Sequence, residues 1–518
     1  MGLVRSTFAI PTASLLCAVF SSIGAFLLGF DTGIFSTTIV HPSFKIYMFH
    51  NKLGNAVLTG TIASTYTAGT AIGGLSSGWM ADRFGRKRCI IGSAAIIIVG
   101  TIIQTAAINI GMIIAGRVIA GLPIGVLLSI VPVYNAELAL PKYRGMIVGL
   151  FGAMASFGVL CSNWVGYACF FATGNAQWRI PLGCQAPFAI ILFIGGFFLP
   201  ESPRWLIKKD RDQEAYEILT RVHGILGEDY VSREFTQMRE QTSIEGQGGF
   251  RDCFKTPSAR KRIALGIFIT VFNNLGGTPV ISAYQSQLFT QIGFPGLKTL
   301  FLSGFYGLAG FIGVLINIGL VADRMGRRTT MCIGAATLLI DLIILMPLSK
   351  LYTGSTNEAG KAAAVAFIFV HSFVYSVFMF GTVWVYLSEI FPTKLRAQGL
   401  AISTFWGQVV SVILQQVGLQ IYNDIGYLFY IVFIVCTAAA GFVYYYYLPE
   451  TKGVTLEEIS AFFGDEVVAT LHESKAGIER VHSRAAGCDD EPSGVQQEDT
   501  PATPKERAVE VENVSSRV

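Results

Sequence analysis

The feature that most constrains this sequence is a series of long apolar runs without charged residues. Residues 56–80, 180–199 and 299–322 hold no Asp, Glu, Lys or Arg. A run of about 20 apolar residues can cross the hydrocarbon core of a bilayer as a helix, in which every backbone polar group finds a partner. Only 14% of the 518 residues are charged, whereas soluble proteins average about 25%. We therefore predict an all-α protein embedded in a membrane.

Twelve helices account for these runs. We predict transmembrane helices at about residues 8–36, 56–80, 89–109, 111–134, 146–170, 180–199, 263–290, 299–322, 329–349, 363–388, 397–421 and 426–448. The first run is longer than the apolar segment of a cleavable signal, so it is taken as the first helix. The nine cysteines show neither metal-ligand spacing nor a disulfide framework, so we expect no metal and no cofactor.

Basic residues mark one side of the membrane. They cluster at Arg83, Arg86, Lys87 and Arg88, at Arg204, Lys208, Lys209 and Arg211, at Lys261 and Arg262, and at Arg324, Arg327 and Arg328. A loop on the opposite side, residues 37–55, holds only Lys45 and Lys52. The positive-inside rule then places the basic loops and both termini in the cytoplasm. These charges flank helices and do not form one basic face, so nucleic-acid binding is not expected.

Three motifs occur twice, in the same order. They are Asp82-Arg83-Phe84-Gly85-Arg86 with Asp323-Arg324-Met325-Gly326-Arg327 (323 − 82 = 241), Glu137 and Arg144 with Glu389 and Arg396 (389 − 137 = 252), and Pro200-Glu201 with Pro449-Glu450 (449 − 200 = 249). A nearly constant offset indicates a duplicated unit of six helices. Halves related by an axis along the membrane normal typically bind a solute near the middle of the bilayer.

The duplication predicts four regions. They are a six-helix bundle at 1–206, a cytoplasmic helical linker at 207–261, a second six-helix bundle at 262–464 and a disordered cytoplasmic tail at 465–518. The linker is polar but has apolar residues at helical spacing. The tail is polar and nearly free of aromatic residues, which is typical of disorder.

At its motifs the chain resembles the sugar porter family of the major facilitator superfamily, and its fungal members most. The similarity rests on Gly29-Phe30-Asp31-Thr32-Gly33, residues 78–88, Gly116-Arg117 with Gly121 and Gly125, Pro200-Glu201-Ser202-Pro203-Arg204-Trp205-Leu206, Trp384-Val385-Tyr386-Leu387-Ser388-Glu389-Ile390-Phe391-Pro392 and Pro449-Glu450-Thr451-Lys452-Gly453. It covers nearly the whole chain except the tail. It implies the major facilitator fold, with twelve transmembrane helices in two pseudo-symmetric six-helix bundles.

The repeated charged motifs are predicted to form a cytoplasmic gate. Its residues are Asp82, Arg83, Arg86, Glu137, Arg144 and Glu201, with Asp323, Arg324, Arg327, Glu389, Arg396 and Glu450 in the second half. The resemblance implies that ion pairs among them close the cytoplasmic side in one state and break in the other. The simpler interpretation is that the arginines only set topology, but it leaves the matching acids unexplained.

Asp31 and Arg117 lie in or beside apolar runs of the first and fourth predicted helices. An ionisable group at membrane depth is costly, so it usually has a partner or a task. The resemblance to proton-coupled sugar porters implies that Asp31 takes up a proton and pairs with Arg117. The alternative is a permanent ion pair in a facilitator. Asp341 and His371 also lie in apolar runs, and each is either a further titrating group or a structural polar contact.

The expected binding cleft departs from the family pattern. The resemblance places substrate contacts at Asn273, Asn274, Tyr284, Gln285, Trp384, Trp406 and Gln408. It also places Gly152, Pro279 and Phe405 where the family usually has amide side chains. Every buried hydroxyl needs a partner. Either the changes are drift and a sugar's hydroxyls are served by Asn273, Asn274, Gln285 and Gln408, or the solute is less hydroxylated or larger than a hexose.

The resulting prediction is a secondary active transporter that imports a sugar or sugar-like solute with protons, in the plasma membrane. One alternative is a transporter or exporter of a less polar metabolite, such as a sugar acid, a polyol derivative or a secondary metabolite. Another is a non-transporting nutrient receptor, which the short tail and the intact Asp31 and Arg117 disfavour. No set of nucleophile, base and orienting residue indicates an enzyme. No protein partner is evident, so the expected partners are the solute, H+ and the lipid bilayer.

Overall fold

The computed structural model describes residues 12–49, 56–140, 144–245, 250–321, 324–392, 394–452, 454, 459 and 462–464. The predicted tail at 465–518 lies outside these residues. So do Asp323 and the side chain of Arg144, two of the predicted gate residues.

The first half consists of helices in series. They are α1 (Thr12–Ser21), α2 (Ile23–Thr38), the short α3 (Pro42–Phe49), α4 (Ala56–Phe84), α5 (Arg86–Thr105), α6 (Ile110–Leu138), α7 (Arg144–Cys169), α8 (Ala176–Gly183) and α9 (Gln185–Gly196). The pairs α1 with α2 and α8 with α9 each follow one another within a single membrane span. Asn109 caps α6, because its Oδ1 accepts the Met112 N–H at 2.9 Å.

The second half repeats this order. Its helices are α13 (Pro257–Leu275), α14 (Thr278–Ile292), α15 (Leu297–Ile316) with the π-turn Asn317–Val321, α16 (Arg327–Tyr352), α17 (Glu358–Tyr375), the π-turn Ser376–Phe380, α18 (Gly381–Ile390), α19 (Arg396–Ile425), a 3₁₀ turn (Gly426–Leu428) and α20 (Phe429–Tyr447). The seventh span breaks between α13 and α14, where Gly277 has a φ of +90°. Glycine adopts this conformation at little cost.

The described residues contain ten helical segments that are long and apolar enough to cross a membrane. One of them, Arg396–Tyr447, contains two helices, α19 and α20. A further helix, α4, is 29 residues long but rich in Gly, Ser and Thr, which lowers its hydropathy. Together these give the predicted twelve spans in two six-helix bundles.

Small residues bring the helices close together. A Cβ atom on Gly73 of α4 would lie 1.9 Å from the Leu122 carbonyl oxygen of α6, and one on Gly125 would lie 2.1 Å from that of Thr70. Such contact is typical of packing in membranes, where helix association depends on close approach. The glycine-rich stretch around Gly125 therefore serves packing.

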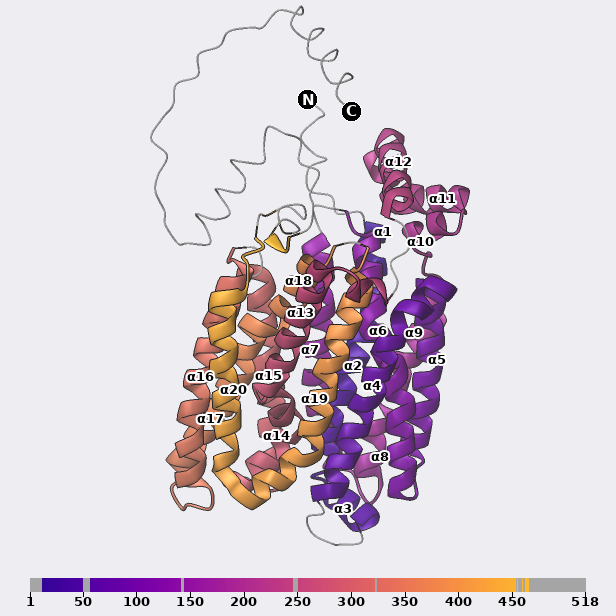
Figure 1. Cartoon of the computed structure of the whole chain (residues 1–518). Helices are drawn as coiled ribbons and strands as arrows, with labels where there is room; N and C mark the ends of the chain where they lie inside the picture. The colour runs from indigo at the N-terminus through magenta and orange to yellow at the C-terminus, as the bar shows by residue number, and fades with distance from the viewer. Residues whose placement is uncertain are drawn as a thin grey trace, which may run out of the picture. The chain divides into compact units, whose positions relative to one another are not determined.

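The linker between the halves is helical. It contains α10 (Pro203–Lys208), α11 (Asp212–His223), a 3₁₀ turn (Gly224–Leu226), α12 (Glu228–Glu245) and a 3₁₀ turn (Asp252–Phe254). Figure 1 shows α10 to α12 beyond the end of the helices where the repeated arginine motifs lie, and α3 at the other end. We call the end with residues 82–88 and 324–328 the arginine-rich end, and the other the opposite end.

Candidate functional site

Asp31 and Arg117 form a buried ion pair between α2 and α6. Arg117 Nη1 lies 3.0 Å from Asp31 Oδ2, and both side chains are almost fully buried. Arg117 Nε also donates to the Ile62 carbonyl of α4 at 3.4 Å. Its guanidinium carbon lies 4.5 Å from the ring centre of Phe35 and 4.6 Å from that of Tyr66. Two rings and one carboxylate therefore stabilise this cation in a region without bulk water.

One side of the Asp31 carboxyl is available for a further contact. Its Oδ1 is buried and has no hydrogen-bond partner within standard geometry among the described residues. The Tyr66 hydroxyl and the Gln185 amide nitrogen share this condition, and both side chains interact with the same carboxyl. Three polar groups thus converge at the carboxyl, where a proton on Asp31 would supply a further donor. Sequence reasoning missed Tyr66 and Gln185, although a lone Gln in an apolar run was a signal.

At the arginine-rich end of the first half, Arg86 joins three helices. Its guanidinium donates two hydrogen bonds to the Glu137 carboxylate of α6, at 2.9 and 3.1 Å. Its backbone N–H donates to Glu201 Oε1 at 2.9 Å. Asp82 accepts from Lys208 Nζ of the linker helix α10 at 3.0 Å. These contacts bring four of the predicted gate residues together and add Lys208.

The second half repeats this arrangement. Arg327 Nη2 lies 3.1 Å from Glu389 Oε1, and the Arg327 backbone N–H donates to Glu450 Oε1 at 2.7 Å. The Thr451 hydroxyl donates to Glu389 Oε2 at 2.6 Å. Each of the ion pairs Arg86–Glu137 and Arg327–Glu389 joins residues of one half. In this conformation these ion pairs stabilise the packing of helices within each half.

The remaining described gate residues make other contacts. The Arg83 guanidinium carbon lies 5.5 Å from the Trp79 ring centre. The Arg324 carbonyl accepts from Lys452 Nζ at 2.7 Å, and Arg396 Nε donates to the Phe391 carbonyl at 3.4 Å.

Toward the opposite end, hydrogen bonds join the two halves directly. We call the residues that make them the seam. The contacts are Ser36 Oγ to Ser286 Oγ at 3.2 Å, Ser64 Oγ to Gln416 Oε1 at 2.8 Å, Thr67 Oγ1 to Gln415 Oε1 at 2.8 Å, Gln285 Nε2 to Asn163 Oδ1 at 3.2 Å and Asn163 Nδ2 to the Ser303 carbonyl at 2.9 Å. The seam holds the halves together on the side away from the arginine motifs.

Two predicted substrate residues are buried on α14. Gln285 belongs to the seam and is fully buried, and its Oε1 has no partner among the described residues. Tyr284 donates its hydroxyl to the Gln415 carbonyl of α19, within the second half. In this conformation Gln285 lies between the halves, and Tyr284 is buried inside one of them.

The other predicted substrate residues are more accessible. Trp384 and Trp406 are 37% and 48% exposed, and Gln408 is half-buried. Asn273 Nδ2 donates to the Tyr375 hydroxyl at 3.1 Å, which leaves its buried Oδ1 without a partner among the described residues. Asn274 instead donates to the Thr270 carbonyl of its own helix at 2.8 Å.

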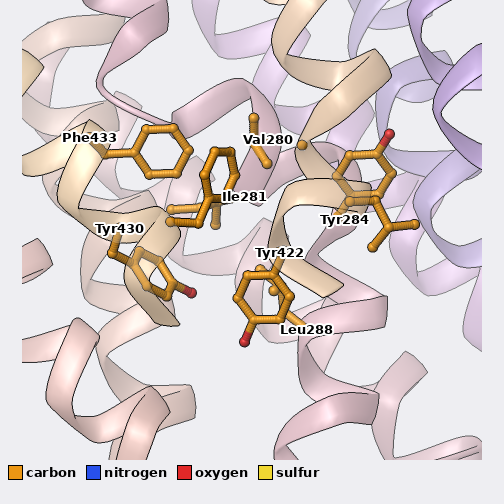
Figure 2. Close-up of a pocket in the computed structure, with 10 residues that line it drawn as sticks. Val280, Ile281, Tyr284, Leu288, Tyr422, Tyr430 and Phe433 are labelled. Carbon is orange, nitrogen blue, oxygen red and sulfur yellow. The ribbon is translucent and has the colours of Figure 1, made fainter. Parts of the chain in front are cut away.

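A cavity inside the second half is apolar. Figure 2 shows Val280, Ile281, Tyr284 and Leu288 of α14 lining it. They face Tyr422, Tyr430 and Phe433 of α19 and α20 (Figure 2), and the lining also contains Gly418, Leu419 and Phe429. The cavity lies within one bundle and offers few polar partners, so it does not suit a polyhydroxylated solute.

Comparison with known proteins establishes the family. Residues 16–463 match the family model "Sugar (and other) transporter". The chain belongs to this sugar transporter family. It is 33% identical over 465 residues to "MFS-type transporter criB" of Aspergillus cristatus, covering 89% of this chain and 95% of the relative. It is 30% identical to a "High-affinity glucose transporter" of Kluyveromyces lactis, with coverages of 86% and 84%, and to a "Quinate permease" of Neurospora africana, with 86% and 88%.

Solved structures show the same fold. The proton:xylose symporter XylE, bound to 6-bromo-6-deoxy-D-glucose, matches with a TM-score of 0.73 at 21% identity, over 88% of this chain and 100% of that chain. A partially occluded inward-open conformation of XylE from E. coli matches with a TM-score of 0.72 at 21% identity, over 86% and 100% of the two chains. The protein is therefore a multi-pass membrane transporter with the major facilitator fold.

One position where this sugar transporter family member departs from the expected pattern lies at an apolar contact. A Cβ atom on Gly152 of α7 would lie 3.5 Å from the Phe380 ring. Phe380 in turn contacts the Tyr375 ring, with centres 6.2 Å apart. An amide expected at position 152 is thus replaced by space beside an aromatic side chain from the other half.

Proposed function

We propose that the protein is a proton-coupled symporter of a polyhydroxylated ring solute, with the arginine-rich end in the cytoplasm. The observation that carries the proposal is the Asp31–Arg117 pair, at 3.0 Å and buried on both sides. Protonation of Asp31 removes the carboxylate charge and leaves the guanidinium to its aromatic neighbours. Because that change weakens the contact between α2 and α6, proton binding and helix movement are linked.

The sidedness follows from the basic loops and the positive-inside rule. On that assignment the seam closes the extracellular side. The ion pairs Arg86–Glu137 and Arg327–Glu389 each lie within one half, which suits a state open to the cytoplasm. Return to the opposite state requires contacts between the halves at the arginine-rich end, for which the predicted gate residues are placed.

The solute class draws support from two sources. Relatives include a glucose transporter and a quinate permease, whose named solutes are hydroxylated rings. The unpartnered acceptors Asn273 Oδ1 and Gln285 Oε1 suit hydroxyl donors, and the exposed rings of Trp384 and Trp406 suit the apolar face of a ring. A second candidate, a less polar metabolite, is favoured by Gly152 beside Phe380.

The test is uptake of labelled sugars, polyols and sugar acids into transport-deficient yeast, with and without a protonophore. Asp31→Asn should abolish accumulation against a gradient while sparing exchange of the same solute. The matched control is Glu358→Gln, which neutralises an acid that is 72% exposed at the opposite end and should accumulate solute normally. Uphill uptake by Asp31→Asn equal to wild type would overturn the proton-coupling role. No uptake of any compound on the panel, with the protein shown to be in the membrane, would favour the second candidate.

A further inference from the structure

The second half contains a buried acid and a buried base in contact. His371 of α17 is fully buried, and Asp341 of α16 is 3% exposed. His371 Nδ1 lies 3.0 Å from Asp341 Oδ2, and His371 Nε2 lies 3.1 Å from Thr278 Oγ1 of α14. Asp341 Oδ1 is buried and has no hydrogen-bond partner among the described residues. We call these three residues the second-half triad.

The triad occupies the place that the duplication assigns to the Asp31–Arg117 pair. Thr278 lies 278 − 31 = 247 residues after Asp31, and His371 lies 371 − 117 = 254 residues after Arg117. The first offset lies within the 241 to 252 residues that separate the repeated motifs, and the second exceeds that range by two residues. The helices correspond as well, because α2 packs on α6 and α14 packs on α17. The base has kept its position, whereas the carboxylate now comes from α16.

The triad lies deep in the span. At 1.5 Å per residue, Asp341 is about 21 Å from the Arg327 end of α16 and about 16 Å from the Tyr352 end. With a doubly protonated imidazole the pair is neutral, and both ring nitrogens donate, one to Asp341 and one to Thr278. With a neutral imidazole the pair carries one net negative charge, and Nε2 must accept from the Thr278 hydroxyl. A net charge at this depth costs several kcal/mol, so the proton leaves only when the triad meets water or a nearby charge.

Movement of α14 would change that environment. Thr278 is the first residue of α14 and follows the break at Gly277. A cavity lined by Asn273, Thr278 and Tyr375 adjoins the break, so the helix has space on one side. Further along α14, Ser286 makes its seam contact with Ser36. Bending at the break therefore moves the triad and the seam together.

Among the described residues, three tyrosines face the triad from its own and neighbouring elements. Tyr375 lies one turn further along α17, Tyr306 of α15 contacts Ser372, and Tyr430 of α20 interacts with Asp341. Tyrosines stay neutral across the physiological range. The charge of the cluster at these pH values is therefore set by Asp341 and His371.

We propose that Asp341 and His371 form a second proton-binding site, and that its occupancy is linked through Thr278 to the bend of α14 and the closure of the seam. The proposal is independent of the solute and of proton binding at Asp31. After proton release, His371 Nε2 accepts a hydrogen bond from the Thr278 hydroxyl instead of donating one. The net charge that remains on the triad favours the arrangement of α14 that admits water.

The test uses the purified full-length protein in detergent, without solute. Spin labels at Lys45 and Glu358 report the distance between the halves at the opposite end, because both side chains are exposed and lie in different halves. The distance distribution is measured from pH 5 to pH 9. We expect Asp31→Asn to keep a pH-dependent change and Asp31→Asn/Asp341→Asn to lose it. A distance profile of the double variant identical to that of Asp31→Asn would overturn the proposal.

Two further variants separate proton binding from its mechanical link. Both are made in the Asp31→Asn background, so that only the second-half triad is tested. Thr278→Val keeps both titratable side chains of the triad but removes the hydroxyl that contacts His371. It should retain proton uptake after a pH jump, measured with a dye in weak buffer, while the spin-label distance becomes independent of pH. His371→Gln should lose both signals, and it serves in place of Asp341→Asn if that variant does not fold. Unchanged proton uptake in His371→Gln would show that the triad does not titrate. Because no solute is present, failure of the symport proposal leaves this result unaffected.

Discussion

Gly60 of α4 lies at a close contact between the two halves. A Cβ atom at this position would lie 2.3 Å from the Gln416 carbonyl oxygen of α19. Gly60→Ala therefore requires the helices to separate by about 1 Å, and overfilling a close-packed contact costs about 1–3 kcal/mol. The seam hydrogen bonds from Ser64 and Thr67 would weaken as well, and each is worth about 1 kcal/mol.

This cost applies only to the conformation in which the seam is closed. The gain in helix propensity from Gly to Ala, about 1 kcal/mol, is the same in both conformations and cancels. Since 1.4 kcal/mol is a factor of ten in an equilibrium constant, Gly60→Ala should shift the population away from the closed seam by about 10- to 100-fold.

The assay is the distance between spin labels at Lys45 and Glu358, which should move to the longer population in Gly60→Ala. The control is Gly78→Ala on the same helix, because a Cβ atom there meets nothing within 4 Å. If Gly60→Ala and Gly78→Ala give the same distance distribution, the reasoning from close packing at the seam is wrong.

Three other predictions concern stability, measured by thermal unfolding of the purified protein. Asp31→Asn leaves the Arg117 guanidinium buried without its carboxylate, which should lower the free energy of unfolding by about 3–5 kcal/mol. Adding Arg117→Gln should recover part of this loss. A double variant less stable than Asp31→Asn would contradict the argument. Arg86→Ala breaks a nearly buried ion pair and should destabilise the folded protein by about 3 kcal/mol. Arg211→Ala breaks an exposed ion pair, which is worth at most about 1 kcal/mol. Equal losses of stability in the two variants would refute the contrast. Burial lowers the pKa of His41 from 6.5 to about 4. Between these pH values the unfolded chain binds a proton at His41 and the folded chain does not. The free energy of unfolding should therefore fall by up to about 3 kcal/mol as the pH drops from 6.5 to 4. His41→Asn should flatten this decline, and an unchanged pH profile would rule it out.

The spans and the duplication could be predicted from the sequence because each leaves a local mark. Uninterrupted apolar runs reveal the helices. A lone charge in such a run usually has a partner or a task, but it was the resemblance to sugar porters that implied the pairing of Asp31 with Arg117. That Arg86 and Glu137, and Arg327 and Glu389, belong to one charged network was likewise predictable, since the arginines and the acids each recur in the second half, at offsets of 241 and 252 residues.

The seam left no comparable mark. Ser36, Ser64, Thr67 and Asn163 are small polar residues of the kind that occur throughout membrane helices, and nothing in their spacing identifies which of them face the other half. The contact of His371 with both Asp341 and Thr278 was equally hard to predict from the sequence. Three helices bring these residues together, and the carboxylate does not occupy the position that the duplication would assign to it.

The structure connects both buried protonatable sites to one contact. Asp31 lies five residues before Ser36 on α2, and Thr278 lies eight residues before Ser286 on α14. The hydroxyls of Ser36 and Ser286 meet at 3.2 Å in the seam. Such a bond is worth only about 1 kcal/mol, so rotation or bending of either helix by one proton-binding event is enough to weaken it. If both sites act, protons in either half bias the same closure, and the bias from two sites multiplies the effect of each on the population.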